Sequence, residues 1–349
     1  MKKTFVLLAA AIFLFAGVCV SADESVVIDF TLLDADIIVD ADGNPTQNRR
    51  TAMDYSVAAL ASFNPEQRAA LRTSLALREW EVHLNSSARS VESLSKSGVR
   101  AVPVRTEAQV PFAGKNIMGV RILFPSTNAH ANARVVPSFA IPAYEAYAET
   151  DENGDRPGAA GAGPNGEVKL FEGGYGLVRN VGVIRAIQVT AYGNSFPYAL
   201  YVILKDQDEV EHRYLMGSMG FDGWKEMRWT NPDYISDVRG RVSALRPLYP
   251  QMELPFVTFV GFQVVRDPMV PGGDFISYFK DVKIIYDRAQ DTSERDIAEE
   301  DVWGIIENRE KGNQQREMEK FGAKQIGRYI AKEKVAAEQN FTSSLESEQ

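Results

Sequence analysis

The sequence has few of the side chains that most often carry enzymatic chemistry. Its 349 residues contain one cysteine, Cys19, and three histidines, His83, His130 and His212. A single cysteine cannot form an intrachain disulfide, and no two histidines stand at the spacing of a zinc motif. No G-x-S-x-G motif occurs, and nothing nominates a carboxylate pair for glycoside hydrolysis. We therefore predict no catalytic residue and no cofactor, and we interpret the chain as a non-enzyme.

Positive charge is also scarce. The chain has 38 lysines and arginines against 47 aspartates and glutamates, which gives a formal net charge of -9. Nucleic-acid binders need a basic surface to displace counterions, and anionic membranes attract basic segments, so neither is an expected partner. Because 45% of the residues are hydrophobic, the chain can still bury a large core.

Long hydrophobic runs are missing except at the N-terminus. Residues 5–18 form an apolar run that follows two lysines and is followed by small residues ending at Ala22. This pattern predicts a signal peptide over residues 1–22, with cleavage after Ala22 and export to the periplasm. The run is shorter than the ~20 residues of a spanning helix, so we expect no membrane association after cleavage. A lipoprotein signal at Cys19 is the alternative, which the bulky Val18 disfavours.

Alternation of apolar and polar residues is the dominant pattern in the mature chain. It is clearest over residues 183–234, where turn residues separate successive alternating runs. A period of two places side chains on opposite faces of a strand, so these runs predict antiparallel β-hairpins. Strands are also predicted at residues 26–30, 37–39, 80–84, 120–124, 257–266 and 279–286. The pattern favours a mainly β protein built as a sandwich.

Two segments have a helical pattern instead. Residues 51–79 are rich in alanine and contain Asn64 followed by Pro65, a helix-start signal, and we predict a small helical insert there. Residues 289–349 are highly charged, with apolar residues three or four apart, which predicts an amphipathic helical tail after a domain over residues 23–288. The tail could fold back on its own domain or dock on a partner subunit, and the periodicity favours neither.

Two loop motifs imitate ligand sites. Residues 161–166 have the G-x-G-x-x-G spelling of dinucleotide-binding loops, but they lie in a segment rich in glycine, proline and alanine, without the flanking strand and helix. Residues 151–155 place oxygen ligands at alternate positions, as calcium loops do, but Arg156 and Ala162 break the rest of that pattern. We predict neither a nucleotide site nor a calcium loop in this region.

The aromatic residues allow two interpretations. Met227 and Trp229 are expected on one face of a strand, and Trp224 precedes them in the same run. Large aromatics commonly fill a sandwich core or form cross-strand pairs. They can also form platforms on which sugar rings stack. Trp224 and Trp229 are therefore the candidate residues of an alternative function, a periplasmic carbohydrate-binding protein that uses aromatic residues on a sheet face.

Several short segments, spread over nearly the whole mature chain, have a distinctive sequence: residues 26–30, 80–82, 192–198, 216–217, 221–225, 231–235, 247–250 and 278–284. Together they resemble the spirochaete flagellar filament outer-layer (sheath) protein family. The resemblance implies a jelly-roll β-sandwich similar to carbohydrate-binding modules. It also implies a structural component of the periplasmic flagellum that coats the flagellin core and contributes to filament shape, stiffness and motility. Core flagellins and neighbouring copies of the chain would be its partners.

The jelly-roll resemblance also implies a candidate metal site. Such modules often hold a structural calcium between an acid in the first strand and an aspartate in the last, and Asp29 and Asp281 stand in those positions. Calcium takes six to eight oxygen ligands, and two acids alone do not supply them. The other interpretation is that both residues are ordinary surface or turn acids.

Overall fold

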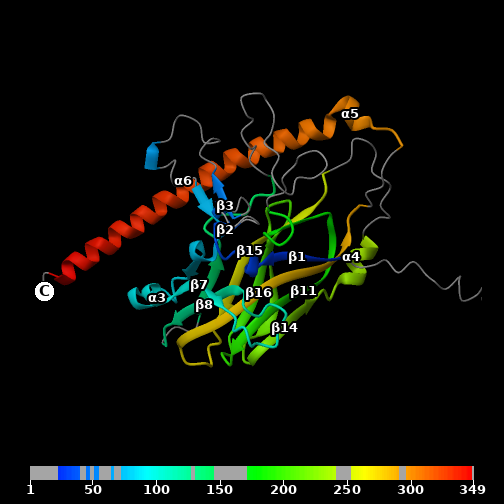
Figure 1. The fold of residues 1–349 in the computed structure, drawn as a ribbon. Helices are drawn as coiled ribbons and strands as arrows, with labels where there is room; N and C mark the ends of the chain where they lie inside the picture. Colours follow the sequence, from blue (N-terminus) through cyan, green and yellow to red (C-terminus); the bar gives the residue numbers. More distant parts are fainter. Residues whose placement is uncertain are drawn as a thin grey trace, which may run out of the picture.

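A computed structural model shows two layers of β-strands with a long helix lying across them (Figure 1). The part of the chain that the structure describes comprises residues 23–39, 45–47, 51–54, 64–66, 72–126, 130–144, 171–240, 253–290 and 296–347. The predicted signal peptide, its cleavage site after Ala22 and the two loop motifs at residues 151–155 and 161–166 lie outside these residues.

The first layer is an antiparallel sheet with the strand order β14-β11-β16-β8-β7, and β1 also pairs with β16. Its two longest strands, β11 and β16, lie side by side, and over much of their length buried residues alternate with half-buried ones. Its strands are β1 (Asp23–Asp29), β7 (Gly98–Pro103), β8 (Asn116–Phe124), β11 (Val181–Asn194), β14 (Asp222–Thr230) and β16 (Gly273–Arg288).

The second layer is also antiparallel, with the order β13-β12-β15-β9-β6, and β10 pairs with β15. The chain passes repeatedly from one sheet to the other, which is the connectivity of a jelly-roll sandwich. The mainly β fold predicted from the alternating pattern is therefore confirmed. The strands of this sheet are β6 (Glu81–Leu84), β9 (Asn132–Val136), β10 (Leu177–Arg179), β12 (Ala199–Lys205), β13 (Glu211–Ser218) and β15 (Phe256–Val265).

Phenylalanine side chains fill the space between the sheets. Phe262 of the second sheet stacks on Phe279 of the first, with ring centroids 4.4 Å apart and an interplanar angle of 22°. Phe30, from the short 3-10 helix η1 (Phe30–Leu32), lies 5.8 Å from Phe262 and 5.5 Å from Trp80. All four residues are at most 4% exposed, so this cluster is part of the core that joins the sheets.

The described parts of residues 51–79, where a helical insert is predicted, are mostly strand at the start and strand followed by a 3-10 turn at the end. β4 (Ala52–Asp54) pairs antiparallel with β5 (Arg72–Ser74), and a 3-10 turn, η2 (Leu77–Glu79), follows. Residues 52–54 and 72–74 therefore pair as strands, where the sequence predicts helix. Pro65 and Glu66 are helical, and most of the residues between β4 and β5 lie outside the described ranges.

The serine-rich segment of residues 86–98 contains a short helix. The structure places helix α3 (Val91–Lys96) within this segment. Ser90 is its N-cap, and the Ser90 hydroxyl accepts a hydrogen bond from the backbone N–H of Ser93 at 3.0 Å. Serine therefore acts as a helix-start signal in this segment.

The C-terminal tail is helical, as predicted. Helix α5 (Glu299–Trp303) ends at Gly304, which adopts a left-handed conformation, and α6 (Ile305–Ser347) follows. Figure 1 shows α6 crossing the sandwich and continuing beyond it toward the C-terminus. The remaining described elements are β2 (Ile37–Val39), which pairs with β3 (Pro45–Gln47), and helix α4 (Tyr234–Gly240).

Residues 313–332 of α6, which we call the strap, pack on the chain's own sandwich. Phe321 is 6% exposed, and its ring centroid lies 5.8 Å from that of Phe139. Ion pairs flank this apolar contact. At one edge of the second sheet Glu81 of β6 pairs with Arg328 at 2.6 Å and Lys332 at 2.5 Å. Of the two sequence interpretations of the tail, the structure therefore shows the one in which it folds back on its own domain.

The other edge of the second sheet also holds the strap. Glu209, in the turn between β12 and β13, accepts hydrogen bonds from Lys320 at 2.9 Å and from Lys324 at 3.5 Å. Glu209 has a φ of 62°, in the left-handed region that non-glycine residues rarely adopt. The turn is thus held in an uncommon backbone conformation at the point where it contacts the strap.

Glu81 makes the attachment of the strap sensitive to pH. Burial on its own raises the pKa of Glu81, but hydrogen bonds from His83, Lys332 and Arg328 outweigh burial and hold that pKa far below its usual range. A carboxylate whose pKa is lower in the folded state contributes stability above its unfolded pKa and loses it as the pH falls toward the folded pKa.

We expect Glu81→Gln to loosen the strap by about 1 kcal/mol, which corresponds to roughly fivefold faster tryptic cleavage within α6 at neutral pH. The difference from wild type should be constant above pH 5 and narrow below pH 4.5, the usual value for the group. Glu92→Gln is the matched control, because Glu92 pairs with Lys96 of its own helix and not with α6. Equal cleavage rates in wild type and Glu81→Gln would contradict the assignment.

Candidate functional site

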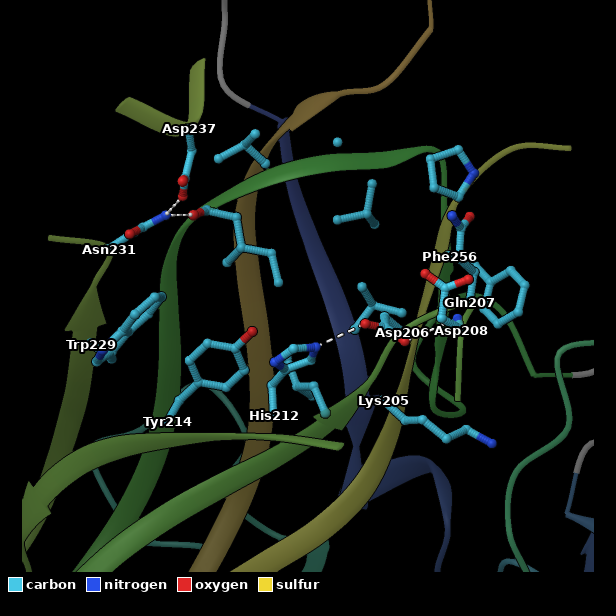
Figure 2. A pocket seen from close by; sticks show the side chains of 17 residues that line it. Lys205, Asp206, Gln207, Asp208, His212, Tyr214, Trp229, Asn231, Asp237 and Phe256 are labelled. Carbon is cyan, nitrogen blue, oxygen red and sulfur yellow. Dashed lines mark hydrogen bonds and ion pairs between the residues drawn. The ribbon is translucent and has the colours of Figure 1, made fainter. Parts of the chain in front are cut away.

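A cleft of about 420 Å³ opens beside the sandwich where the two sheets approach each other. The start of β11, the end of β12, β13, the end of β14, α4 and the start of β15 contribute to it. Figure 2 shows the side chains that line it. They are Val181, Val183, Ile184, Leu204, Lys205, Asp206, Gln207, Asp208, His212, Tyr214, Trp229, Asn231, Asp237, Pro255, Phe256 and Val257, together with Gly182.

Asp206 organises the turn at one side of the cleft. Its Oδ1 accepts hydrogen bonds from the backbone N–H groups of Asp208 at 2.9 Å and Val210 at 3.0 Å. Its Oδ2 lies 2.8 Å from Nε2 of His212. Burial on its own raises the pKa of Asp206, but the bonds from His212 and the backbone outweigh it and lower that pKa. Both carboxylate oxygens are therefore engaged, and the turn is fixed in place.

Three rings form a row along the wall of the cleft (Figure 2). His212 and Tyr214, two residues apart on β13, have ring centroids 6.4 Å apart. Tyr214 and Trp229 of β14 are 4.7 Å apart with an interplanar angle of 60°. Because β13 and β14 belong to different sheets, this contact closes one side of the sandwich.

The hydroxyl of Tyr214 points into the cleft (Figure 2) and has no hydrogen-bond partner among the described residues. Burial raises the pKa of Tyr214, and the nearby Asp206 carboxylate adds to that rise. The hydroxyl therefore stays protonated at neutral pH and is able both to donate and to accept a hydrogen bond.

Asn231 forms the far end of the cleft. Its side-chain amide donates to the backbone carbonyl of Ile184 and to Oδ2 of Asp237, both at 3.0 Å. These bonds connect the end of β14 to β11 and to α4. The polar groups at this end are thus oriented by the fold before any ligand arrives.

The two tryptophans named from the sequence do not come together. Trp229 lines the cleft with Tyr214, whereas Trp224 packs against Phe112 at 4.8 Å and against Tyr192 at 5.3 Å. They are five residues apart on one strand, so their side chains lie on opposite faces of the sheet. They cannot form a single platform, and only Trp229 belongs to the cleft.

Asp29 and Asp281, the candidate calcium ligands, do come together. β1 and β16 pair with Asp29 opposite Asp281. The cation between them is the ammonium of Lys280, which lies 3.0 Å from Oδ2 of Asp29 and 2.7 Å from Oδ2 of Asp281. Oδ1 of Asp29 accepts hydrogen bonds from the backbone N–H and the hydroxyl of Thr31. Oδ1 of Asp281 is buried and has no hydrogen-bond partner within the part of the chain that the structure describes.

These residues do not fit a calcium site, because one free carboxylate oxygen beside an ammonium group falls far short of six to eight oxygen ligands. More widely, no group of three or more potential metal-ligating side chains is found in the described ranges. We therefore derive no metal chemistry from this chain.

Most of the cleft is not predicted from the sequence. Tyr214, Asn231 and Asp206 were not named as site residues, although His212 and Tyr214 alternate in the strand pattern and must share a face. That pattern was the available signal. The contact between Tyr214 and Trp229 depends on how the two sheets pack, and the periodicity within each strand does not predict that packing.

The strand order and the strap together define a class of protein, a jelly-roll β-sandwich with a C-terminal helix folded across one sheet. Comparison with known proteins then gives the family. Residues 44–295 match the family model described as flagellar filament outer layer protein FlaA. The chain belongs to this family, and its role is in the outer layer of the flagellar filament.

Three curated relatives with the name of this family match most or nearly all of the chain. The flagellar filament outer layer protein of Treponema pallidum is 49% identical over 99% of this chain and 97% of its own length. That of Spirochaeta aurantia is 36% identical over 98% of this chain and 95% of its own. A relative from Borreliella burgdorferi is 30% identical over 78% of this chain and 74% of its own.

Solved structures give weak likenesses. The family 11 carbohydrate-binding module of the Clostridium thermocellum cellulase Lic26A-Cel5E matches with a TM-score of 0.24 and 11% identity, over 62% of this chain and 91% of the module. TmCBM61 in complex with β-1,4-galactotriose matches with a TM-score of 0.25 and 10% identity, over 60% of this chain and 90% of that chain.

Among the described residues, none of the helices combines the length and apolar character needed to cross a bilayer.

Proposed function

We propose that this chain is a structural subunit that coats the flagellin core of a periplasmic flagellum. The observation that carries the proposal is the 49% identity to a flagellar filament outer layer protein over 99% of the chain. In the coat, each copy would contact flagellin and its neighbouring copies, and the coat would add to the stiffness and shape of the filament and so to motility. The predicted signal peptide supports export to the periplasm by a route separate from the flagellum.

Symmetry supports this role. A head-to-tail interface that does not close into a ring generates an extended helical array, so one modest interface repeated along the filament is sufficient for a coat. The sandwich provides a rigid unit for such an array because its two sheets enclose the core. Helix α6 is held against the second sheet through the contacts of the strap.

Deleting the gene and imaging periplasmic flagella by cryo-electron tomography would test the proposal. We expect a thinner filament with altered curvature, and recovery of the original diameter when the full chain is restored. Flagella purified from wild-type cells should contain the chain in amounts that scale with filament length. Purified filaments without the chain, or filaments of unchanged diameter after deletion, would refute the coat role.

A further inference from the structure

We propose that the cleft beside Trp229 is a binding site for a neutral saccharide. The inference goes beyond the proposed structural function. Its volume of about 420 Å³ lies within the range of roughly 300 to 1,000 Å³ that small-molecule sites occupy.

The wall of the cleft offers apolar ring faces. Trp229 and Tyr214 are half-buried, so part of each ring remains accessible to a ligand, and His212 extends the row. A pyranose has one face of C–H groups that packs on an aromatic ring, while its hydroxyl groups project sideways. Aromatic residues with a polar tip suit such a ligand, because they combine apolar contact with hydrogen bonding.

The Tyr214 hydroxyl supplies an available polar group. It points into the cleft and has no partner among the described residues, in contrast to the engaged oxygens of Asp206 (Figure 2). A half-buried hydroxyl that lacks a partner loses part of its hydration without compensation, and a ligand hydroxyl would restore the lost bond. Gln207 and Asp208, which also line the cleft, offer further donors and acceptors.

The charges of the cleft select a neutral ligand. Lys205 is the only lysine or arginine among the lining residues that the structure describes, and Figure 2 shows it extending away from the row of rings. Burial lowers the pKa of Lys205, and its charged surroundings include Lys324 and Glu209 at the strap. Three aspartates line the same cleft, so phosphates and acidic sugars would be repelled.

The aspartates are not arranged to capture a cation either. Asp206 is fully engaged with the turn and His212, and Asp237 accepts a bond from Asn231. Besides the exposed carboxylate of Asp208, what remains is a set of ring faces and hydrogen-bonding groups rather than a concentrated charge. This combination favours a polyhydroxyl ligand over an ammonium group.

The same chemistry is offered by a sugar attached to a protein and by a cell-wall glycan strand. We would therefore titrate the purified mature chain with neutral oligosaccharides from a glycan array, with soluble cell-wall glycan fragments, and with tetramethylammonium as a cationic probe. The array and the cell-wall arm identify the source of the sugar. Because the assay uses the isolated chain, its result is independent of the coat role.

We expect Trp229→Ala to lower saccharide affinity about tenfold or more, and Tyr214→Phe, which removes one oxygen, to lower it about fivefold. Trp224→Ala is the matched control, because Trp224 lies on the same strand but on the opposite face, and it should leave affinity unchanged. Unfolding midpoints of all three variants show whether the fold is kept, and Tyr214→Phe keeps the ring packing in any case.

Three results would overturn the proposal. One is the absence of binding by any neutral saccharide at millimolar concentration. Another is binding that survives in Trp229→Ala and Tyr214→Phe, or that Trp224→Ala reduces equally. The third is salt-sensitive binding of tetramethylammonium without binding of sugar, which would make the cleft a cation site.

Discussion

Replacing Phe262 with alanine is expected to lower the free energy of unfolding by about 3 to 5 kcal/mol. Phe262 is fully buried, stacks on Phe279 at 4.4 Å and lies 5.3 Å from Phe259 and 5.8 Å from Phe30. Its ring therefore contacts both sheets and η1 at once. Truncation removes the buried ring area and leaves a cavity that the surrounding β-strands, tied by their ladders, cannot collapse to fill.

Denaturant unfolding monitored by circular dichroism measures this effect, with Trp303→Ala as the control. Trp303 is 67% exposed on α5, so its truncation should change the stability of the free chain by less than about 0.5 kcal/mol. If the two alanine variants lose the same stability, or if Phe262→Ala unfolds at the wild-type denaturant concentration, then Phe262 does not join the sheets as the structure shows.

The sequence predicts most of the strands because the core of a sandwich imposes a period of two. Residues 187–189, 200–204 and 211–216 alternate clearly, and they lie in β11, β12 and β13. The burial of Met227 beneath exposed neighbours on β14 also follows from this period alone. Such local patterns are readable because each strand must present one face to the other sheet.

The periodicity of a segment does not predict which distant segment it pairs with. The β4–β5 ladder joins two three-residue strands that are too short for any alternating pattern, and the sequence between them resembles helix. The cleft has the same limitation, since residues 181–184, 204–214, 229–237 and 255–257 form it from four separate parts of the chain. The face on which each side chain lies can be predicted strand by strand, but the contacts between side chains of different strands cannot.

The pair of Asp29 and Asp281 combines a feature that the sequence indicates with one that it does not. Asp29 and Asp281 are opposite each other in the β1–β16 ladder, as their positions in the first and last strands imply. The register between β11 and β16 shifts at the same point, because Thr190 faces Asp281 and Ala191 faces Phe279. Lys280 is the extra residue of this β-bulge. A bulge re-aims a side chain, so Lys280 reaches its neighbour Asp281 rather than the opposite face.

Lys280 therefore supplies the positive charge where calcium was considered, and replacing it should be strongly destabilising. We expect Lys280→Met to lower the free energy of unfolding by about 3 to 5 kcal/mol, because it leaves the buried carboxylate of Asp281 without its cation. Lys283→Met on the same strand is the matched control. Lys283 pairs with the exposed Glu24, and an exposed pair contributes about 0 to 1 kcal/mol.

A double variant separates charge from packing. Lys280→Met combined with Asp281→Asn removes both members of the buried pair, and we expect it to recover part of the stability that the single variant loses. A chelator should leave the unfolding midpoint of the wild-type chain unchanged. A midpoint that falls with chelator and rises with added calcium would instead show that these acids bind the metal.

The pH dependence of the difference between wild type and Lys280→Met has a fixed sign. Burial on its own lowers the pKa of Lys280, but hydrogen bonds to Asp281 and Asp29 outweigh burial and raise that pKa above its usual 10.5. A group whose pKa is raised by folding contributes its full stability below the unfolded pKa and loses it as the pH rises through the folded pKa. The difference in stability should therefore be constant from pH 7 to about pH 10 and shrink above pH 10.5. A difference that grows over this alkaline range would show that the ammonium of Lys280 does not stabilise the acid pair.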